Sequence, residues 1–392
     1  MPFVEASSVR FLTSPEGARA LEAARDARAL PIHRRAEALT GLGAPDAIRA
    51  ALQQDDLRRR AAERCPHADV LLFTAEALEQ ATAWPVAAER ATRWPEASTV
   101  VDLGAGIGLD ALAAAQAGHT VEAFERDPVR AALLRFNAAA LGLDARVRVR
   151  EDDVREAAPT GACAYFDPDR RPGGTRTRDP DAFEPPADAW PALLAGFERA
   201  MIKLPPVVEG DLPLDGAEEV VSLGGRARER RLLVGDWPDA PHRRALALPS
   251  GRSVAGEGVP PPPPAAVEEG RWLLDPDVSV TLAGLLGDLA LRDGLAPITD
   301  GVAYLVGDAP NEVSPGHFVR VDAILRAKPK ALNAWLRTHE VGDLTIRKRG
   351  IEAKASDWRK RLRTGGPNAA TLVFTRDARE RWVVYASLEA EA

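Results

Sequence analysis

The chain has 392 residues, a formal net charge of −7 and two cysteines, and 45% of its residues are hydrophobic. This length predicts about two or three domains with ample core, and the negative charge argues against a protein that coats nucleic acid uniformly. Cys65 and Cys163 lie far apart and outside any C-x-x-C pair, which excludes a disulfide framework and a cysteine zinc site. No apolar run reaches about 18 residues and no signal peptide is evident, so we expect a cytoplasmic protein.

The hydrophobic pattern divides the chain into three parts. Residues 1–93 show the periodicity of helices and are rich in Ala, Leu and Arg. From residue 94 strands alternate with helices, which is typical of a parallel sheet. A five-proline run at 260–264 indicates an extended spacer or loop, or a ligand of SH3-type domains. We therefore predict a helical region at 1–93, an α/β domain at 94–298 and a smaller α+β domain at 299–392.

A glycine-rich turn follows the first predicted strand of the α/β domain. Apolar residues around Asp102 predict the end of a buried strand, and Gly104, Gly106 and Gly108 separate it from a helical run. Glycine lets a ligand approach the backbone closely because no Cβ intervenes, and ligands of open α/β sheets bind at this edge. A dinucleotide site needs G-x-G-x-x-G, but Leu109 occupies the third glycine position. The turn therefore departs from the dinucleotide pattern. Two other interpretations of the glycines are a variant nucleotide site and a turn that binds nothing.

Acidic residues follow the next two predicted strands. The strand at 120–125 ends in Glu125, whose carboxylate can accept both ribose hydroxyls of a cofactor, as in NAD sites. The strand at 146–150 is followed by Asp152 and Asp153. Each acid alone is most simply a solvated loop carboxylate. Acids at three successive strand ends, however, predict one binding site at the carboxyl edge of the sheet.

The fourth predicted strand, 164–166, leads into a loop that carries candidate chemistry. Asp167 and Pro168 come directly after the strand and are followed closely by Arg170 and Arg171. The two arginines could hold a phosphate or a carboxylate of a substrate, or form exposed salt bridges within the loop. We see no His-rich spacing and expect no metal.

The last part of the chain predicts a basic α+β unit. A helix at 277–292 precedes it, strands are expected near 301–306, 318–324, 344–348, 370–374 and 382–386, and helices at 330–339 and 355–363. This order suggests a small ferredoxin-like fold. From Arg320 to Arg363 there are thirteen Lys or Arg and five Asp or Glu, which is the electrostatic footprint of phosphate binding. Arg347, Lys348 and Arg349 alternate along one strand, so two of them should point the same way.

The D-x-G-x-G-x-G pattern at 102–108 resembles motif I of the class I S-adenosyl-L-methionine (SAM) methyltransferases. The resemblance implies a Rossmann-like sheet, SAM as the cofactor and an acid after the third strand that binds the adenine amino group. Asp153 aligns best with that acid, and Asp152 is the near alternative. The cofactor-binding residues implied are Asp102, Gly104, Gly106, Gly108, Glu125, Asp152 and Asp153.

The loop after the fourth strand resembles motif IV of amino-directed methyltransferases, usually (D/N/S)-P-P-(Y/W/F). In that motif the first side chain and a proline-fixed carbonyl accept hydrogen bonds from the acceptor amine. Here Asp169 replaces the second proline and Arg170 replaces the aromatic, which weakens the case for base-stacking amine methylation. Asp167, Pro168 and Arg170 are the candidate catalytic residues. SAM is already a strong electrophile, so positioning and electrostatics supply most of the acceleration.

Two further segments resemble a bacterial methyltransferase family with a THUMP-like C-terminal domain. Residues 71–82 and 86–90 resemble the helix before its catalytic domain, and Leu-Thr-Ile-Arg-Lys-Arg-Gly at 344–350 is the most distinctive match to its C-terminal unit. The resemblance covers roughly residues 70–392. THUMP domains present RNA to modifying enzymes, so it implies methylation of tRNA or rRNA. The implied RNA-binding residues are Arg171, Arg347, Lys348 and Arg349.

Two other functions remain open. One is a small-molecule methyltransferase whose appended parts form a lid or a dimer interface, and salt-dependent RNA binding would separate it from the RNA hypothesis. The other is a non-catalytic RNA-binding protein with a retained SAM fold, against which Asp102, Glu125 and Asp153 argue. For each of these functions we expect that the protein binds neither a membrane nor a metal ion. The sequence leaves the oligomeric state open.

Overall fold

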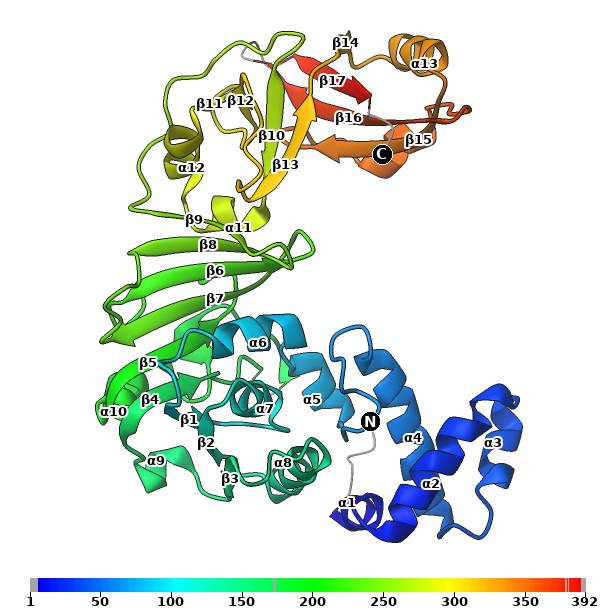
Figure 1. Cartoon of the computed structure of the whole chain (residues 1–392), viewed down its shortest axis with the longest axis vertical. Helices are drawn as coiled ribbons and strands as arrows, with labels where there is room; N and C mark the ends of the chain where they lie inside the picture. Colours follow the sequence, from blue (N-terminus) through cyan, green and yellow to red (C-terminus); the bar gives the residue numbers. More distant parts are fainter. Residues whose placement is uncertain (1–5, 172–173, 378, 380, 389–392) are drawn as a thin grey trace. The chain divides into compact units, whose positions relative to one another are not determined.

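The computed structural model in Figure 1 describes residues 6–171, 174–377, 379 and 381–388. The chain folds as two compact units. The first comprises Met1–Gly216 and Arg231–Pro238, and the second comprises Ala217–Arg230 and Asp239–Ala392. Within the described ranges, each helix is too short or too polar to span a bilayer.

A parallel sheet forms the centre of the first unit. Its strands run in the order β3-β2-β1-β4-β5. Their bounds are β1 (Thr99–Leu103), β2 (Thr120–Phe124), β3 (Val147–Arg150), β4 (Gly161–Phe166) and β5 (Phe197–Leu204). The predicted strands are thus confirmed to within a few residues. The chain leaves β1 toward β2 and later returns to β4 on the other side of β1, which creates the switch point where such sheets bind ligands.

Helices cover both faces of this sheet. On one face, α7 (Leu109–Gln116) and α8 (Pro128–Ala140) share a buried cluster with Val121 and Ala123 of β2. On the other face, Trp190 of α10 (Trp190–Leu194) packs with Phe166 of β4. The helix α9 (Val154–Ala157) follows β3. The result is the α/β/α layering expected of a Rossmann-like sheet.

The described part of the N-terminal region is helical, as the sequence predicts. It contains α1 (Ala6–Leu12), α2 (Pro15–Asp26), α3 (Ile32–Ala38), α4 (Pro45–Ala61), α5 (Ala75–Gln80) and α6 (Trp84–Ala91). All of these helices except α3 share one hydrophobic cluster with α7 and α8 rather than forming a separate core. The extended segment before α5 is fixed by Gln54, whose side-chain amide pairs with the backbone of Phe73.

The second unit begins with three strands that follow one another in the sheet. They are β6 (Ala217–Leu223), β8 (Arg243–Leu248) and β9 (Arg252–Gly256), and β7 (Arg226–Gly235) contributes only its first half to this unit. A four-stranded sheet follows in the order β11-β12-β10-β13. Its strands are β10 (Trp272–Pro276), β11 (Ala296–Pro297), β12 (Leu305–Gly307) and β13 (Gly316–Arg320). The proline run at 260–264 forms neither helix nor strand.

The single helix predicted at 277–292 is wrong. The structure has two helices there, α11 (Val278–Leu282) and α12 (Leu286–Asp293). Gly284 separates them with a φ of +71°, a left-handed conformation that ends a helix and that glycine adopts most readily.

The C-terminal part of the second unit, called the C-terminal unit below, contains a four-stranded sheet in the order β14-β17-β16-β15. Its elements are β14 (Ala323–Arg326), α13 (Pro329–Thr338), β15 (Val341–Lys348), α14 (Ala355–Arg359), β16 (Asn368–Arg376) and β17 (Trp382–Leu388). The predicted α+β class is confirmed. The element order β-α-β-α-β-β places the hairpin last, whereas the ferredoxin-like order places it in the middle.

One predicted strand of this region is wrong in its continuity. The sequence predicts a single strand at 318–324, but the structure has β13 and β14 there in two different sheets. The chain changes partners between them, because the Val321 N–H donates to Arg271 and the Asp322 N–H donates to Ala386.

Candidate active site

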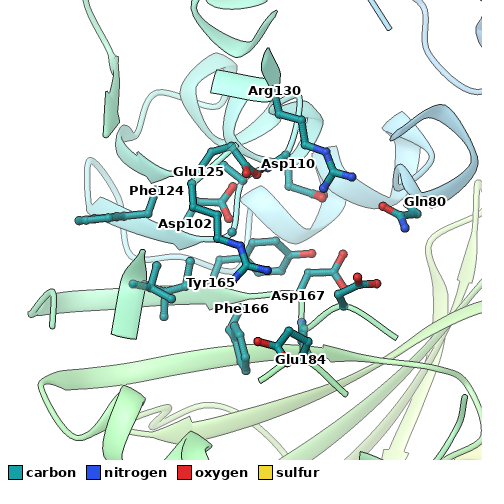
Figure 2. Close-up of a pocket in the computed structure, with 18 of the residues that line it drawn as sticks. Gln80, Asp102, Asp110, Phe124, Glu125, Arg130, Tyr165, Phe166, Asp167 and Glu184 are labelled. Carbon is teal, nitrogen blue, oxygen red and sulfur yellow. Dashed lines mark hydrogen bonds between the residues drawn. The ribbon is translucent and has the colours of Figure 1, made fainter. Parts of the chain in front are cut away.

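A single pocket collects the site residues that the sequence predicts within the first unit. Its empty volume, with the open mouth, is about 1370 Å³, and it lies at the carboxyl ends of β1, β2 and β4 and beside the loop after β3. Figure 2 shows the side chains of Asp102, Asp110, Glu125 and Asp167 around it. The predicted residues that line it are Asp102, Gly104, Gly106, Gly108, Glu125, Asp152, Asp153, Asp167, Pro168, Arg170 and Arg171.

The glycine turn after β1 presents bare backbone to this pocket. The N–H groups of Gly104 and Ala105 donate to the Phe124 carbonyl at 3.0 and 2.8 Å, which fixes the turn against β2. Gly104 and Gly106 have φ of +102° and +59°, and a Cβ on either would meet no heavy atom within 4 Å. Gly108 differs, because a Cβ there would lie 1.9 Å from Leu134. Two of the glycines therefore leave room for a ligand, and the third permits helix packing.

Glu125 ties the end of β2 to the glycine turn. Its carboxylate accepts from the Gly106 N–H and from the Asp127 N–H, each at 2.8 Å, and the residue is buried. An ionised carboxylate offers about four lone-pair positions. The two that remain can accept hydroxyl groups of a ligand in the pocket.

Asp102 is buried, and its pKa is shifted by its surroundings. Burial raises its pKa well above the ordinary value, the carboxylates of Asp110 and Asp167 raise it further, and Arg90 opposes them. Arg90 is itself buried, forms an ion pair with Asp110 and lies 4.5 Å from the ring centre of Tyr165. This concentration of acids favours a cationic ligand.

The two acids after β3 differ in what they contact. Two side-chain nitrogens of Arg155 donate hydrogen bonds to the Asp153 carboxylate at 3.0 and 2.7 Å, and Arg126 donates a longer one at 3.4 Å. These contacts, above all the hydrogen bonds from Arg155, hold the pKa of Asp153 well below its ordinary value. Asp152 also lines the pocket and is exposed, and its side chain has no ion pair among the described residues. Asp152 is therefore the freer acid toward a ligand.

Lys203 is a site residue that our sequence reasoning missed. Phe166 and Ile202 are register partners in β4 and β5, so the next residues, Asp167 and Lys203, are neighbours at the strand ends. The buried Lys203 ammonium donates to the Asp167 carboxylate at 2.5 Å. The available signal was a lone lysine within the buried, otherwise apolar run at 200–204 that ends β5.

The loop after β4 adds positive charge to the same pocket. Asp169 and Glu184 exchange backbone hydrogen bonds at 3.0 and 2.9 Å, which anchors the start of the loop. Arg171 reaches Glu79 at 3.5 Å. Arg176 lines the pocket together with Arg170 and Arg171 and was also missed from the sequence.

The N-terminal region contributes directly to the pocket. Ala77 and Gln80 of α5 line it, and Thr82 donates to Asp110 at 3.1 Å. Asn137, fully buried in α8, donates to the carbonyls of Ile107 and Leu72 at 3.1 Å each. Asn137 thus joins the glycine turn to the segment before α5, and the only signal for it was an amide inside an amphipathic helix.

The three predicted basic residues at the end of β15 and directly after it lie in the second unit and differ in what they contact. Arg347 and Arg349 point the same way, as their alternation predicts, and both bind the Asp275 carboxylate, at 2.9 and 2.7 Å. Their side chains are 27% and 26% exposed, whereas Lys348 is exposed. Among the described residues no three His, Cys, Asp or Glu side chains gather as metal ligands would.

Comparison with known proteins decides the family. The family described as THUMP domain-like matches residues 316–387. An uncharacterized S-adenosylmethionine-dependent methyltransferase of Mycobacterium tuberculosis (strain CDC 1551 / Oshkosh) is 33% identical over 336 residues, which cover 82% of this chain and 90% of the relative. The chain belongs to the S-adenosylmethionine-dependent methyltransferases. The corresponding protein of Mycobacterium tuberculosis (strain ATCC 25618 / H37Rv) is also 33% identical over 336 residues.

A solved structure shares the fold of this methyltransferase almost throughout. A protein of Porphyromonas gingivalis W83 that is assigned as a methyltransferase superposes with a TM-score of 0.76 at 20% identity, covering 95% of this chain and 99% of its own. The predicted Rossmann-like sheet with a helical N-terminal region and a THUMP-like C-terminal unit is therefore confirmed. The predicted cofactor, SAM, is confirmed as well.

The residues of the pocket fit this cofactor. SAM carries a positive sulfonium, which suits the acids that surround Asp102. The open faces of Gly104 and Gly106 leave space against the backbone, and Glu125 keeps lone pairs for hydroxyl groups. When bound, SAM supplies a methyl group on an electrophilic sulfur, so the protein has chiefly to hold the acceptor in line.

Proposed function

We propose that this methyltransferase modifies a base in structured RNA, either tRNA or rRNA. The observation that carries the proposal is the THUMP domain-like match at 316–387 on the same chain as the SAM pocket. THUMP domains present RNA to modifying enzymes, and a bacterial enzyme with such substrates works in the cytoplasm. The alternative, a small-molecule acceptor with the C-terminal unit as a lid or dimer interface, would leave the positive charge of that unit unexplained.

We assign the cofactor to the glycine side of the pocket. Gly104, Gly106 and Gly108 form the turn that SAM lies against, and Glu125 accepts the ribose hydroxyls. Asp102 faces the charged part of the cofactor. Asp153 orders the loop after β3 through Arg155, and its neighbour Asp152 receives the adenine amino group.

We assign the methyl acceptor to the loop after β4. The Asp167 carboxylate is 27% exposed and Lys203 occupies one of its oxygens, so the other remains for a donor on the target base. The carbonyl of Pro168 is the second acceptor, and Arg170 lies beside them. This arrangement orients an exocyclic amine without a strong base, which is sufficient for attack on a sulfonium methyl.

The C-terminal unit offers several cations to a phosphate backbone. Because Arg347 and Arg349 are both engaged by Asp275, we expect Lys348 to be the main RNA contact of the three. Three further exposed cations, for which the described residues provide no ion pair, are Lys354, Lys360 and Arg361. A chain with a net charge of −7 that keeps these cations exposed has a local surface suited to RNA.

The proposal is tested by titrating bulk tRNA and rRNA fragments at several salt concentrations. Single-stranded binding gives a slope of about −0.7 per phosphate contact. Replacing Lys354, Lys360 and Arg361 with glutamine should flatten the slope by up to about 2 units and leave SAM affinity unchanged. The matching change at Arg347, Lys348 and Arg349 should flatten it by about 0.7 units, the share of one free cation.

A charge-matched control separates RNA contacts from a general loss of positive charge. Arg19, Arg49 and Arg59 are exposed on the N-terminal helices, each beside an acid three residues earlier. Their replacement with glutamine should leave the slope as in the wild type. Equal affinities and equal slopes for all variants would favour the small-molecule alternative.

A further inference from the structure

Three arginines converge on the acceptor side of the pocket. Arg170, Arg171 and Arg176 all line it, although four residues separate the last two. The loop closes on itself, because the Thr177 N–H donates to the Arg170 carbonyl at 2.9 Å and the Gly174 N–H donates to the Arg171 carbonyl at 2.8 Å. This closure returns Arg176 to the neighbourhood of Arg170.

The acids near this cluster do not neutralise it. Glu184 pairs with Arg155 at 3.0 Å, and an oxygen of Asp169 accepts from the Arg171 backbone N–H at 2.9 Å. Glu79 approaches Arg171 alone, at 3.5 Å, and its side chain is 52% exposed. In the part of the chain that the structure describes, no carboxylate lies within 4.0 Å of the side-chain nitrogens of Arg170 or Arg176.

The uncompensated charges affect one another. The pKa of Arg176 is lowered, chiefly by desolvation and then by the positive charges of Arg170 and Arg171. Gathering like charges at a pocket wall is unfavourable unless an anion offsets them. Guanidinium groups present paired N–H donors that match the oxygens of a phosphate.

We propose that Arg170, Arg171 and Arg176 form an anion subsite that binds a phosphate group of the methyl acceptor. The subsite belongs to the acceptor because it lies on the loop after β4, with Asp167, whereas the glycine turn and Glu125 form the cofactor side. SAM contains no phosphate. That the phosphate is an RNA phosphodiester, rather than that of a free nucleotide, rests on the proposed function.

The subsite is tested by calorimetry on the full chain saturated with S-adenosyl-L-homocysteine, with inorganic phosphate and adenosine 5′-monophosphate as probes. Each should bind the wild type, and Arg176→Gln should weaken binding at least about 10-fold, the lower end of the worth of a hydrogen bond to a charged group. The Arg170→Gln/Arg176→Gln double variant should weaken it further. Arg176→Lys should retain part of the affinity because it keeps the charge and loses the paired donors.

Arg178→Gln is the matched control. Arg178 lies two residues further along the same loop, is 61% exposed and contacts Glu209 at 3.8 Å outside the pocket. This variant should bind both probes as the wild type does. Equal affinities of the wild type and Arg176→Gln would overturn the subsite. So would loss of phosphate binding on saturation with S-adenosyl-L-homocysteine, because the cluster would then serve the cofactor's carboxylate.

Methylation of bulk RNA separates the subsite from the proposed function. If the wild type methylates RNA and Arg176→Gln shows the same KM for it, the subsite is wrong and the RNA function stands. If RNA is not methylated but Arg176→Gln still weakens phosphate binding, the RNA function is wrong and the subsite stands, with a free nucleotide as the indicated acceptor.

Discussion

Gly106→Val should weaken SAM binding about 5- to 150-fold while leaving the protein folded. In the structure a Cβ at Gly106, which lines the pocket, meets no heavy atom within 4 Å, so the protein leaves open space where the valine side chain would begin. The Gly106 N–H donates to Glu125 at 2.8 Å, and a change of side chain leaves that donor in place. The variant therefore tests whether the open space is where the cofactor lies.

The magnitude follows from two separable effects. The φ of +59° at Gly106 is left-handed, and an L side chain there costs roughly 1–2 kcal/mol of folding free energy. Forcing extra carbons into an occupied space costs about 1–3 kcal/mol, which is about 5- to 150-fold in the dissociation constant. Gly106→Ala, with one added carbon, should fall between the wild type and Gly106→Val.

The assay is calorimetric titration with SAM, together with urea unfolding to measure stability. Gly142→Val is a matched control, because Gly142 has a φ of +67°, equally open space around its Cβ and no place in the pocket lining. It should lose similar stability and bind SAM normally. Unchanged SAM affinity in folded Gly106→Val would refute the assignment of the glycine turn to the cofactor.

Two further predictions concern the carboxylates of the site. Asp167→Ala should keep SAM affinity but reduce methyl transfer to bulk RNA at least about 100-fold, and it should cost about 3–5 kcal/mol of stability because it leaves the buried Lys203 unpaired. Adding Lys203→Met should restore the stability but not the turnover, and normal turnover in the double variant would place the acceptor elsewhere. Asp102→Asn should remove a pH dependence of stability. The folded-state pKa of Asp102 is raised, so the folded protein keeps a proton that the unfolded chain releases near 3.8, and the wild type loses stability relative to the variant as pH rises above that value. Urea unfolding of both proteins between about pH 4.5 and 8 measures the difference, and a difference of the opposite sign would contradict the raised pKa.

The parallel sheet and the cofactor side of the pocket could be predicted from short sequence patterns. The glycine spacing at 104–108 and the acid of Glu125 after its strand depend on near neighbours in sequence, and the structure brings them together within one pocket. The parallel strands around them follow for the same reason, since each is a short apolar run bounded by turn residues.

The remaining features depend on which elements become neighbours in space. Lys203 meets Asp167 only because β5 lies beside β4, and Asn137 meets Ile107 only because α8 packs under the glycine turn. The sequence from 318 to 324 predicts one strand. Only its pairing with two different sheets divides it into β13 and β14. The ion pairs of Arg347 and Arg349 have the same origin, because they depend on Asp275 in another sheet.

The most direct test of the whole account is mass spectrometry of nucleosides from tRNA and rRNA that have been treated with the enzyme and isotope-labelled SAM. The RNA should come from a strain that lacks the enzyme, so that the target site is unmethylated. The account predicts one labelled methylated nucleoside, present with the wild type and nearly absent with Asp167→Ala. Nucleosides without label, from an enzyme shown to bind SAM, would contradict the RNA function.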